Sequence, residues 1–271
     1  MSARARYRHA MSVTVKPVGD LLREWRQRRR MSQLELSLEA EISSRHLSFL
    51  ETGRSQPSRE MVLRLAEHLD VPLRDRNLLL HAAGYAQVFP ERPLDDPALR
   101  IAREAIDQVL AGHEPYPALA VDRHWTLIAA NQATSRVIGE VDPALLKPPV
   151  NVMRLALHPA GMAPRTANLA EWRAHLLARL AHQVQLSGDP VLIRLLRELR
   201  DYPAPAEATH NVDATAFVVP FRLITDAGIL SFFSTTTVFG TPIDITLSEL
   251  AVEAFYPADA LTADALRRLD C

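Results

Sequence analysis

Cysteine is almost absent from this chain: among its 271 residues the only cysteine is the last one, Cys271. A disulfide within the chain and a cysteine-based zinc site are therefore excluded. Long apolar runs are also missing, so no segment is expected to cross a bilayer, and the basic first residues are not followed by the apolar segment of a secretory signal peptide. Together these absences predict a protein of the reducing cytoplasm.

The signatures of common enzyme classes are missing as well. The chain has no G-x-S-x-G nucleophile elbow, no phosphate-binding P-loop and no H-E-x-x-H zinc motif. His175 and His182 lie on one expected helix, but no nearby carboxylate or cysteine completes a metal set. We therefore predict a protein that is not an enzyme and that needs no metal or cofactor.

Charge is unevenly distributed along the chain. Residues 1–90 carry 15 Lys and Arg against 10 Asp and Glu, whereas residues 91–271 carry 16 against 22. The composition, with 48% hydrophobic and 23% charged residues, and the length together suggest about two folded domains. A basic first third joined to an acidic remainder is typical of a DNA-binding domain followed by a domain with another task.

Residues 32–54 have the pattern of two short helices joined by a turn. Ser32 and Glu35 form an S-x-x-E capping box, which predicts that a helix begins directly after the serine. Leu34 and Leu38 repeat four residues apart and mark one apolar face of this helix.

The second helix is expected to begin at Ser43 or Ser44, either of which can cap it. Leu47 and Leu50 point inward, and Gly53 suits the helix end because glycine readily adopts a positive φ. This arrangement leaves one polar and aromatic face directed outward, formed by Ser44, Arg45, Ser48 and Phe49. Arg can bond two acceptors of guanine, Ser can reach several base edges and an aromatic ring can meet a thymine methyl group, so the pattern predicts a helix that enters a major groove.

Further elements are expected on both sides of this pair. Helices are predicted over residues 18–29, 58–69, 73–83 and 98–110. The apolar spacing then changes to the alternation typical of strands, which are predicted over 118–122 and 125–130. Helices are predicted between 131 and 202, and three further strands over 217–223, 229–239 and 246–256. The expected domain boundaries are 1–17 for a flexible basic arm (with Met11 as an alternative start), 18–88, a Pro-rich linker 89–97, and 98–271.

The second domain has the size and the α+β order of a sensor. Its aromatic residues are either ordinary core or the wall of a cavity, and the sequence does not distinguish the two; the candidate wall residues are Trp125, Trp172, Phe217 and Phe232, with Ala254 in the last strand. Three polar residues are candidate anchors for a head group: Asn131, Arg154 and His158. For His158, a structural bond to a loop carbonyl is the competing interpretation.

Residues 18 to about 70 resemble the phage-repressor-like, XRE-type helix-turn-helix domain of five helices. The resemblance implies that Gln33 contacts DNA backbone and base, and that Ser43, Ser44, Arg45 and His46 begin the recognition helix. It also implies that the loop after this helix, with Arg54 and Arg59, meets phosphates, as its chemistry suits. Glu41 stands where the family usually has glycine in the turn.

Motifs spread over nearly the whole chain look like those of the MmyB-like regulators: HLSFLETGRSQPSREM at 46–61, HEPYPAL at 113–119, VDRHW at 121–125, SFFST at 231–235, FGTP at 239–242 and EAFYPAD at 253–259. This resemblance implies an all-α XRE domain followed by a PAS-like α+β domain with a five-stranded antiparallel sheet. It also implies a ligand for the second domain that is similar to a fatty acid.

The expected function is that of a sequence-specific transcriptional regulator. One helix-turn-helix reads half of a site, so we expect a homodimer on a double-stranded operator, with no membrane partner. The second domain is expected to bind a small apolar ligand that modulates DNA binding. Two alternatives stay open: an enzyme or carrier with an incidental DNA-binding domain, and an XRE-type scaffold or antitoxin whose second domain only dimerises.

Overall fold

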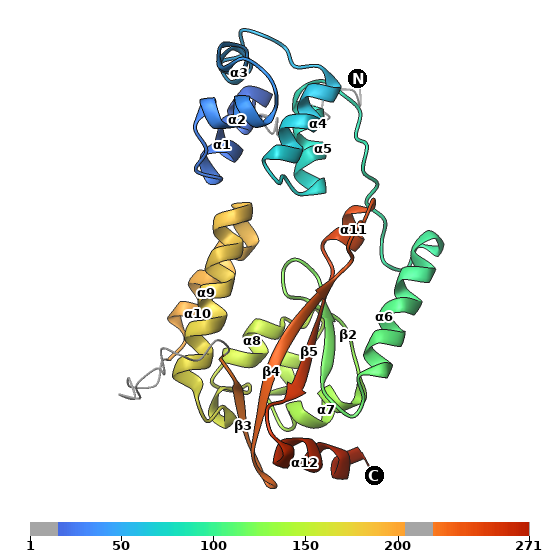
Figure 1. Cartoon of the computed structure of the whole chain (residues 1–271). Coiled ribbons are helices and arrows are strands. Elements are labelled where there is room, and N and C mark those ends of the chain that lie inside the picture. The colour runs from blue at the N-terminus through green and yellow to red at the C-terminus, as the bar shows by residue number, and fades with distance from the viewer. Residues whose placement is uncertain (1–15, 204–218, 271) are drawn as a thin grey trace, which may run out of the picture. The chain divides into compact units, whose positions relative to one another are not determined.

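The computed structural model describes residues 16–203 and 219–270 of the chain (Figure 1). Contacts within the chain divide it into two compact units, residues 1–89 and residues 90–271. No helix in the described part is both long enough and apolar enough to cross a membrane.

The first unit is all-α, as predicted. The five helices in its described residues are α1 Val18–Arg28, α2 Gln33–Glu39, α3 Ser44–Glu51, α4 Arg59–His68 and α5 Leu73–Ala82. Serines cap α2, α3 and α4. Ser32 forms the predicted capping box with Glu35, Ser43 accepts a bond from the backbone N–H of His46, and Ser58 accepts one from the backbone N–H of Met61. Because caps act within one turn of a helix, these starts follow from local sequence.

The apolar face predicted for α2 is not the buried one. Leu34 and Leu38 are 60% and 69% exposed, whereas Leu36 and Ala40 are fully buried. Both pairs have the same four-residue spacing, so the period identifies a helix but does not choose the face. Packing of α2 on α3 and α4 makes that choice.

Helices α1 and α3 approach each other closely at Gly19. A Cβ atom at this position would lie 2.4 Å from the carbonyl oxygen of Leu50, far inside van der Waals contact. Glycine is therefore required here by space rather than by backbone conformation. This contact holds the C-terminal end of α3 against the first turn of α1.

The second unit is an α+β domain built on one five-stranded antiparallel sheet, which confirms the predicted fold class. The strands are β1 Ala118–Val121, β2 Leu127–Ala130, β3 Phe221–Thr225, β4 Gly228–Val238 and β5 Ala251–Pro257, in the order β2-β1-β5-β4-β3. The first and last strands of the sequence thus pair at the centre of the sheet, with Ala120 opposite Val252.

Helices cover both faces of the sheet (Figure 1). One face packs on α6 Arg100–Gly112 through Ile106 and Leu110. The helices that pack on the other face are α7 Gln132–Ile138, α8 Val152–Leu157, α9 Leu169–Ser187, α10 Pro190–Asp201 and α12 Ala260–Asp270. Short turns η1 Pro97–Leu99, η2 Pro143–Leu146, η3 Ala163–Arg165 and α11 Ile245–Ser248 connect them.

Several strand boundaries differ from the prediction, and β3 begins only at Phe221, after the described residues 219 and 220. The strand expected over 246–256 begins only at Ala251, because the Asp244 side chain caps Thr246 (2.9 Å) and starts the short helix α11. The strand expected from residue 125 begins at Leu127, because Trp125 has a φ of 65° and cannot continue an extended strand. Residues 217 and 218 of the third predicted strand lie outside the described residues.

Candidate functional site

The outward face of α3 is the candidate DNA interface. Leu47 and Leu50 are buried at 0% and 1% exposure, which fixes the rotation of the helix about its axis. Arg45 is consequently exposed, while Ser48 and Phe49 are half-buried beside it. Three of the four predicted outward residues, Arg45, Ser48 and Phe49, therefore lie on one accessible face, whereas the hydroxyl of Ser44 is directed toward α2.

Phe49 lies between two arginines. The guanidinium carbon of Arg45 is 5.3 Å from the centre of the Phe49 ring, and that of Arg54 is 5.8 Å from it. Both distances lie within the range of a cation–π interaction. The ring, which is predicted to meet a thymine methyl group, thus also has two cations as neighbours.

The serines at the start of α3 have structural bonds. Ser43 accepts a hydrogen bond from the backbone N–H of His46 at 3.1 Å, as a helix cap. The hydroxyl of Ser44 lies 2.8 Å from that of Ser37 on α2 and ties the two helices together. Arg54 and Arg59 are exposed, in the loop after α3 and at the first residue of α4.

A buried carboxylate organises the start of α2. Glu51, which is 1% exposed, accepts bonds from Arg26 at 2.6 and 2.8 Å and from the Nε2 atom of Gln33 at 2.8 Å. Burial alone would raise the pKa of Glu51, but the bonds from Arg26 and Gln33 and the charges of Arg26 and Arg23 outweigh it, so the pKa lies below its ordinary value. The carboxylate is therefore ionised at neutral pH and holds Gln33 in place.

Glu51 was not among the site residues predicted from the sequence. A usable signal was present, because Glu51 follows Leu47 by four residues and so falls on the inward face of α3. An acidic residue on a buried face requires a cationic partner, and the nearest basic run is at residues 26–30.

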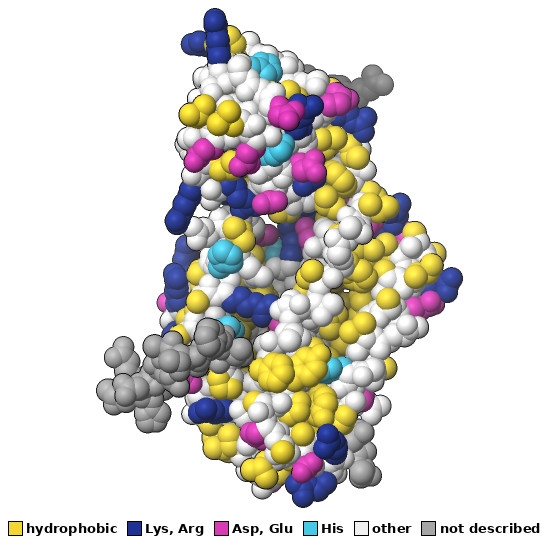
Figure 2. All heavy atoms as spheres, viewed as in Figure 1, with side chains coloured by type: hydrophobic (Ala, Val, Ile, Leu, Met, Phe, Trp, Pro, Cys, Tyr) yellow, Lys and Arg dark blue, Asp and Glu magenta, His cyan; other side chains and the backbone are white. Residues whose placement is uncertain are grey.

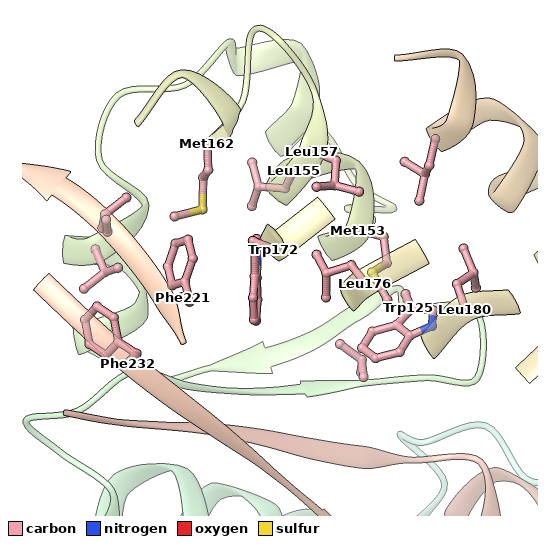
Figure 3. Close-up of a cluster of buried hydrophobic side chains, with 14 of the residues drawn as sticks. Trp125, Met153, Leu155, Leu157, Met162, Trp172, Leu176, Leu180, Phe221 and Phe232 are labelled. Atoms are coloured by element: carbon pink, nitrogen blue, oxygen red, sulfur yellow. The ribbon is translucent and has the colours of Figure 1, made fainter. Parts of the chain in front are cut away.

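A cavity of about 110 Å³ lies in the second unit between the sheet and the helices that cover it. Figure 3 shows part of its wall, where Trp172 stands between Phe221 and Leu176 with Met162 above. The cavity is lined by Pro117, Leu119, Trp125, Leu127, Thr134, Val137, Ile138, Val152, Met153, Leu155, Ala156, Met162, Trp172, Leu176, Phe221, Phe232, Glu253 and Phe255.

Aromatic rings form much of this wall. The ring centres of Trp172 and Phe221 are 5.2 Å apart, and those of Phe221 and Phe232 are 6.0 Å apart. Trp125, Trp172 and Phe232, three of the candidate wall residues, line the cavity. Phe217 lies outside the described residues.

The structure places the three candidate anchors away from the cavity wall. Asn131 caps α7 and bonds the backbone at Ala118 and Tyr116. Arg154 makes two bonds of 2.7 Å to Glu198. The side chains of Asn131 and Arg154 are thus bonded within the fold to partners far away in the sequence, which the local sequence does not reveal.

His158 accepts a bond at Nδ1 from the backbone N–H of Ala160 at 3.0 Å. This histidine thus makes a structural bond in its loop, but the partner is a backbone N–H and not the carbonyl that was expected. Ala254 also lies elsewhere than expected, because its side chain belongs to the apolar cluster on the α6 side of the sheet. Alternate residues of β5 point to opposite faces, so its neighbour Glu253 faces the cavity instead.

Glu253 is the charged residue among those that line the cavity, and it is 4% exposed. Arg179 of α9 neutralises it with two bonds, of 2.6 and 2.9 Å, and the Arg179 guanidinium lies 4.6 Å from the centre of the Trp125 ring. Beside them His175 stacks on Trp172 at 5.4 Å. Burial and the Arg179 charge lower the pKa of His175 against the opposing effect of Glu253, so the stacked imidazole is neutral at neutral pH.

Comparison with known families supports both domains. The model of the MmyB-like transcription regulator ligand binding domain matches residues 102–269, which is more than half of the chain. The chain belongs to the MmyB-like transcription regulator family. A helix-turn-helix model matches residues 22–75. This MmyB-like regulator is thus a DNA-binding transcription regulator with a ligand-binding domain.

Similar proteins cover parts of the regulator. A segment of 78 residues is 37% identical to the uncharacterized HTH-type transcriptional regulator RghRB of Bacillus subtilis (strain 168), over 28% of this chain and 54% of that protein's length. The crystal structure of the clp gene regulator ClgR from Corynebacterium glutamicum is 28% identical over 36% of this chain and 90% of its own, with a TM-score of 0.22. An RNA-binding light-oxygen-voltage receptor is 14% identical over 92% of this chain and 65% of its own, with a TM-score of 0.24. Both TM-scores are too low to indicate a shared overall fold.

Proposed function

We propose that the second domain of this regulator binds a small apolar ligand of the fatty-acid class, and that the ligand changes how a homodimer binds its operator. This proposal rests on the cavity in the second domain. Its wall is formed by aliphatic and aromatic side chains from five strands and three helices. A mostly apolar wall of this kind favours a ligand with an apolar body.

The size of the cavity limits what enters it without a rearrangement. An apolar protein cavity of roughly 150 Å³ is enough to hold benzene. The cavity here measures about 110 Å³, which is smaller and suits a short acyl chain. A longer chain therefore requires the wall to move, and that movement is the step by which occupancy would alter the DNA-binding state.

The charge of the wall argues against a buried carboxylate. Among the described wall residues the charged side chain is Glu253, and Arg179 already neutralises it. A fatty acid would therefore place its alkyl chain in the cavity and its head group outside. A fatty alcohol of the same length should bind about as well as the acid.

Thermal unfolding of the delipidated full-length protein tests the ligand. Straight-chain acids and the matched alcohols, from six to sixteen carbons, are added in turn. A ligand that binds only the folded state stabilises it by about 2.7 kcal/mol at one hundred times its dissociation constant. We expect a rise in the midpoint for at least one chain length.

A filled cavity is the matched control. Ala156 lines the cavity, and Ala156→Leu or the larger Ala156→Trp should remove the ligand-induced rise while operator binding persists. Ala144→Trp places the same bulk at an exposed residue and should leave the rise intact. If no chain length shifts the midpoint, and solvent extraction of the purified protein releases nothing, the ligand proposal fails. The scaffold whose second domain only dimerises then becomes the better description.

The homodimer follows from the geometry of reading DNA. One recognition helix contacts one half-site, so two copies are needed for an operator with two-fold symmetry. Native mass spectrometry of the protein with a footprinted operator duplex measures the stoichiometry. Two chains for each duplex are expected, and one chain would contradict the homodimer.

A further inference from the structure

We propose that Phe49 is a positioning residue that holds Arg45 and Arg54 in their DNA-binding conformations, so that the two arginines act as one unit. The inference rests on the DNA-binding domain alone and is independent of the ligand. It differs from a role in which the ring itself touches a base.

The first observation is the pair of cation–π contacts. Arg45 precedes Phe49 by one helical turn, and Arg54 follows it by five residues, yet both guanidinium carbons lie within 5.8 Å of the ring centre. No ion pair joins either arginine to another residue in the described part of the chain. The ring is thus the contact recorded for both charged groups.

The second observation is independent of the ring. The backbone carbonyl of Phe49 accepts bonds from the N–H groups of Arg54 at 2.8 Å and Ser55 at 3.1 Å. Gly53, with a φ of 70°, allows the chain to turn back in this way. Phe49 therefore positions the loop with its main chain and the two arginine side chains with its ring.

Figure 2 shows the result on the surface: dark blue and yellow side chains lie side by side over α3, at the top of the view. Two like charges beside one half-buried ring repel each other in the free protein. A DNA phosphate or the acceptor edge of a guanine relieves that repulsion. Because the ring already restricts both side chains, less conformational entropy is lost when they bind.

Double-mutant cycles in the full-length protein test this inference on a footprinted operator. Phe49→Leu removes the ring but keeps an apolar side chain, and Phe49→Tyr keeps the ring. Ordering a long side chain on binding costs about 2- to 10-fold in affinity. We expect Phe49→Leu to weaken operator binding by at least about 2-fold. Phe49→Tyr should bind the operator with nearly the affinity of the native protein. We also expect Arg45→Ala and Arg54→Ala each to cost less in the Phe49→Leu background than in the native one.

Arg59 supplies the matched control, because no contact between it and Phe49 is recorded among the described residues. Phe49→Leu and Arg59→Ala should be additive within about twofold. Urea unfolding of each variant checks that the fold persists. Additive effects for Phe49 with both Arg45 and Arg54 would overturn the inference. So would a loss confined to one A·T pair, since that result indicates a direct contact between the ring and a thymine methyl group.

Discussion

Gln33 and Glu51 are joined by a hydrogen bond of 2.8 Å, from the side-chain amide at the start of α2 to a carboxylate with no exposed surface. The same carboxylate binds Arg26 of α1. One buried charge therefore connects three helices and sets the position of a candidate DNA contact. The stability of the domain and the position of its contact surface are consequently linked.

Glu51→Gln should destabilise the first domain by about 3 kcal/mol, because loss of one partner of a buried pair leaves the other charge uncompensated. Urea unfolding of the full-length protein measures the change. Glu24→Gln is the matched control, since Glu24 pairs with Lys16 and Arg28 at the surface, where its side chain is 36% exposed. That substitution should cost less than about 1 kcal/mol. Equal losses of unfolding free energy for the two variants would show that the burial of Glu51 does not determine the size of the loss.

The lowered pKa of Glu51 predicts how stability depends on pH. A carboxyl whose pKa is lower in the folded state stabilises the fold above its unfolded value, about 4.3 for Glu. Between that value and the folded pKa the unfolded chain binds more protons, so stability falls as the pH falls through this window. The difference in unfolding free energy between the native protein and Glu51→Gln should therefore shrink below about pH 4.5. A difference that stays constant from about pH 7 to about pH 3 would contradict the lowered pKa.

Arg45→Ala should weaken binding to the operator by about 1–3 kcal/mol and relax the preference at one base pair. The reason is its exposed position in the first turn of α3, where a guanidinium can bond two guanine acceptors. Competition binding against single-base operator variants measures the preference. If the preference is unchanged at every position, Arg45 does not read a base.

Arg54→Ala and Arg59→Ala should weaken specific and non-specific DNA binding alike. Both side chains are exposed beyond the end of α3, where phosphates rather than base edges are in reach. Each substitution should reduce the slope of log affinity against log salt by about one. A selective loss on the operator, with the salt slope intact, would exclude the phosphate assignment.

Glu41→Gly should stabilise the first domain by up to about 1 kcal/mol. Glu41 has a φ of 53°, which costs a residue with a Cβ about 1–2 kcal/mol. The greater freedom of glycine in the unfolded chain cancels part of that gain, roughly 0.5–1 kcal/mol. Glu39→Gly, at an exposed position in the last turn of α2, should instead lower stability by about 1 kcal/mol. The two unfolding midpoints in urea are expected to move in opposite directions.

Local patterns predicted much of this architecture. The serine caps at residues 32, 43 and 58 and the order of strands and helices follow from interactions within a few residues of each other along the chain. The inward direction of Leu47 and Leu50 follows in the same way. Such short-range features can be predicted from the sequence, because a capping bond or a helical repeat does not depend on how distant segments meet.

Features that depend on distant partners were decided by packing. The buried face of α2, the role of Glu51 and the neutralisation of Glu253 by Arg179, 74 residues away, each require two elements to meet. The same holds for Asn131 and Arg154, which do not line the cavity and are bonded inside the fold to Tyr116 and Glu198. The period of a helix or strand fixes which residues share a face. Which face is buried, and which polar group finds a partner there, is set by the free energy of the whole packed domain.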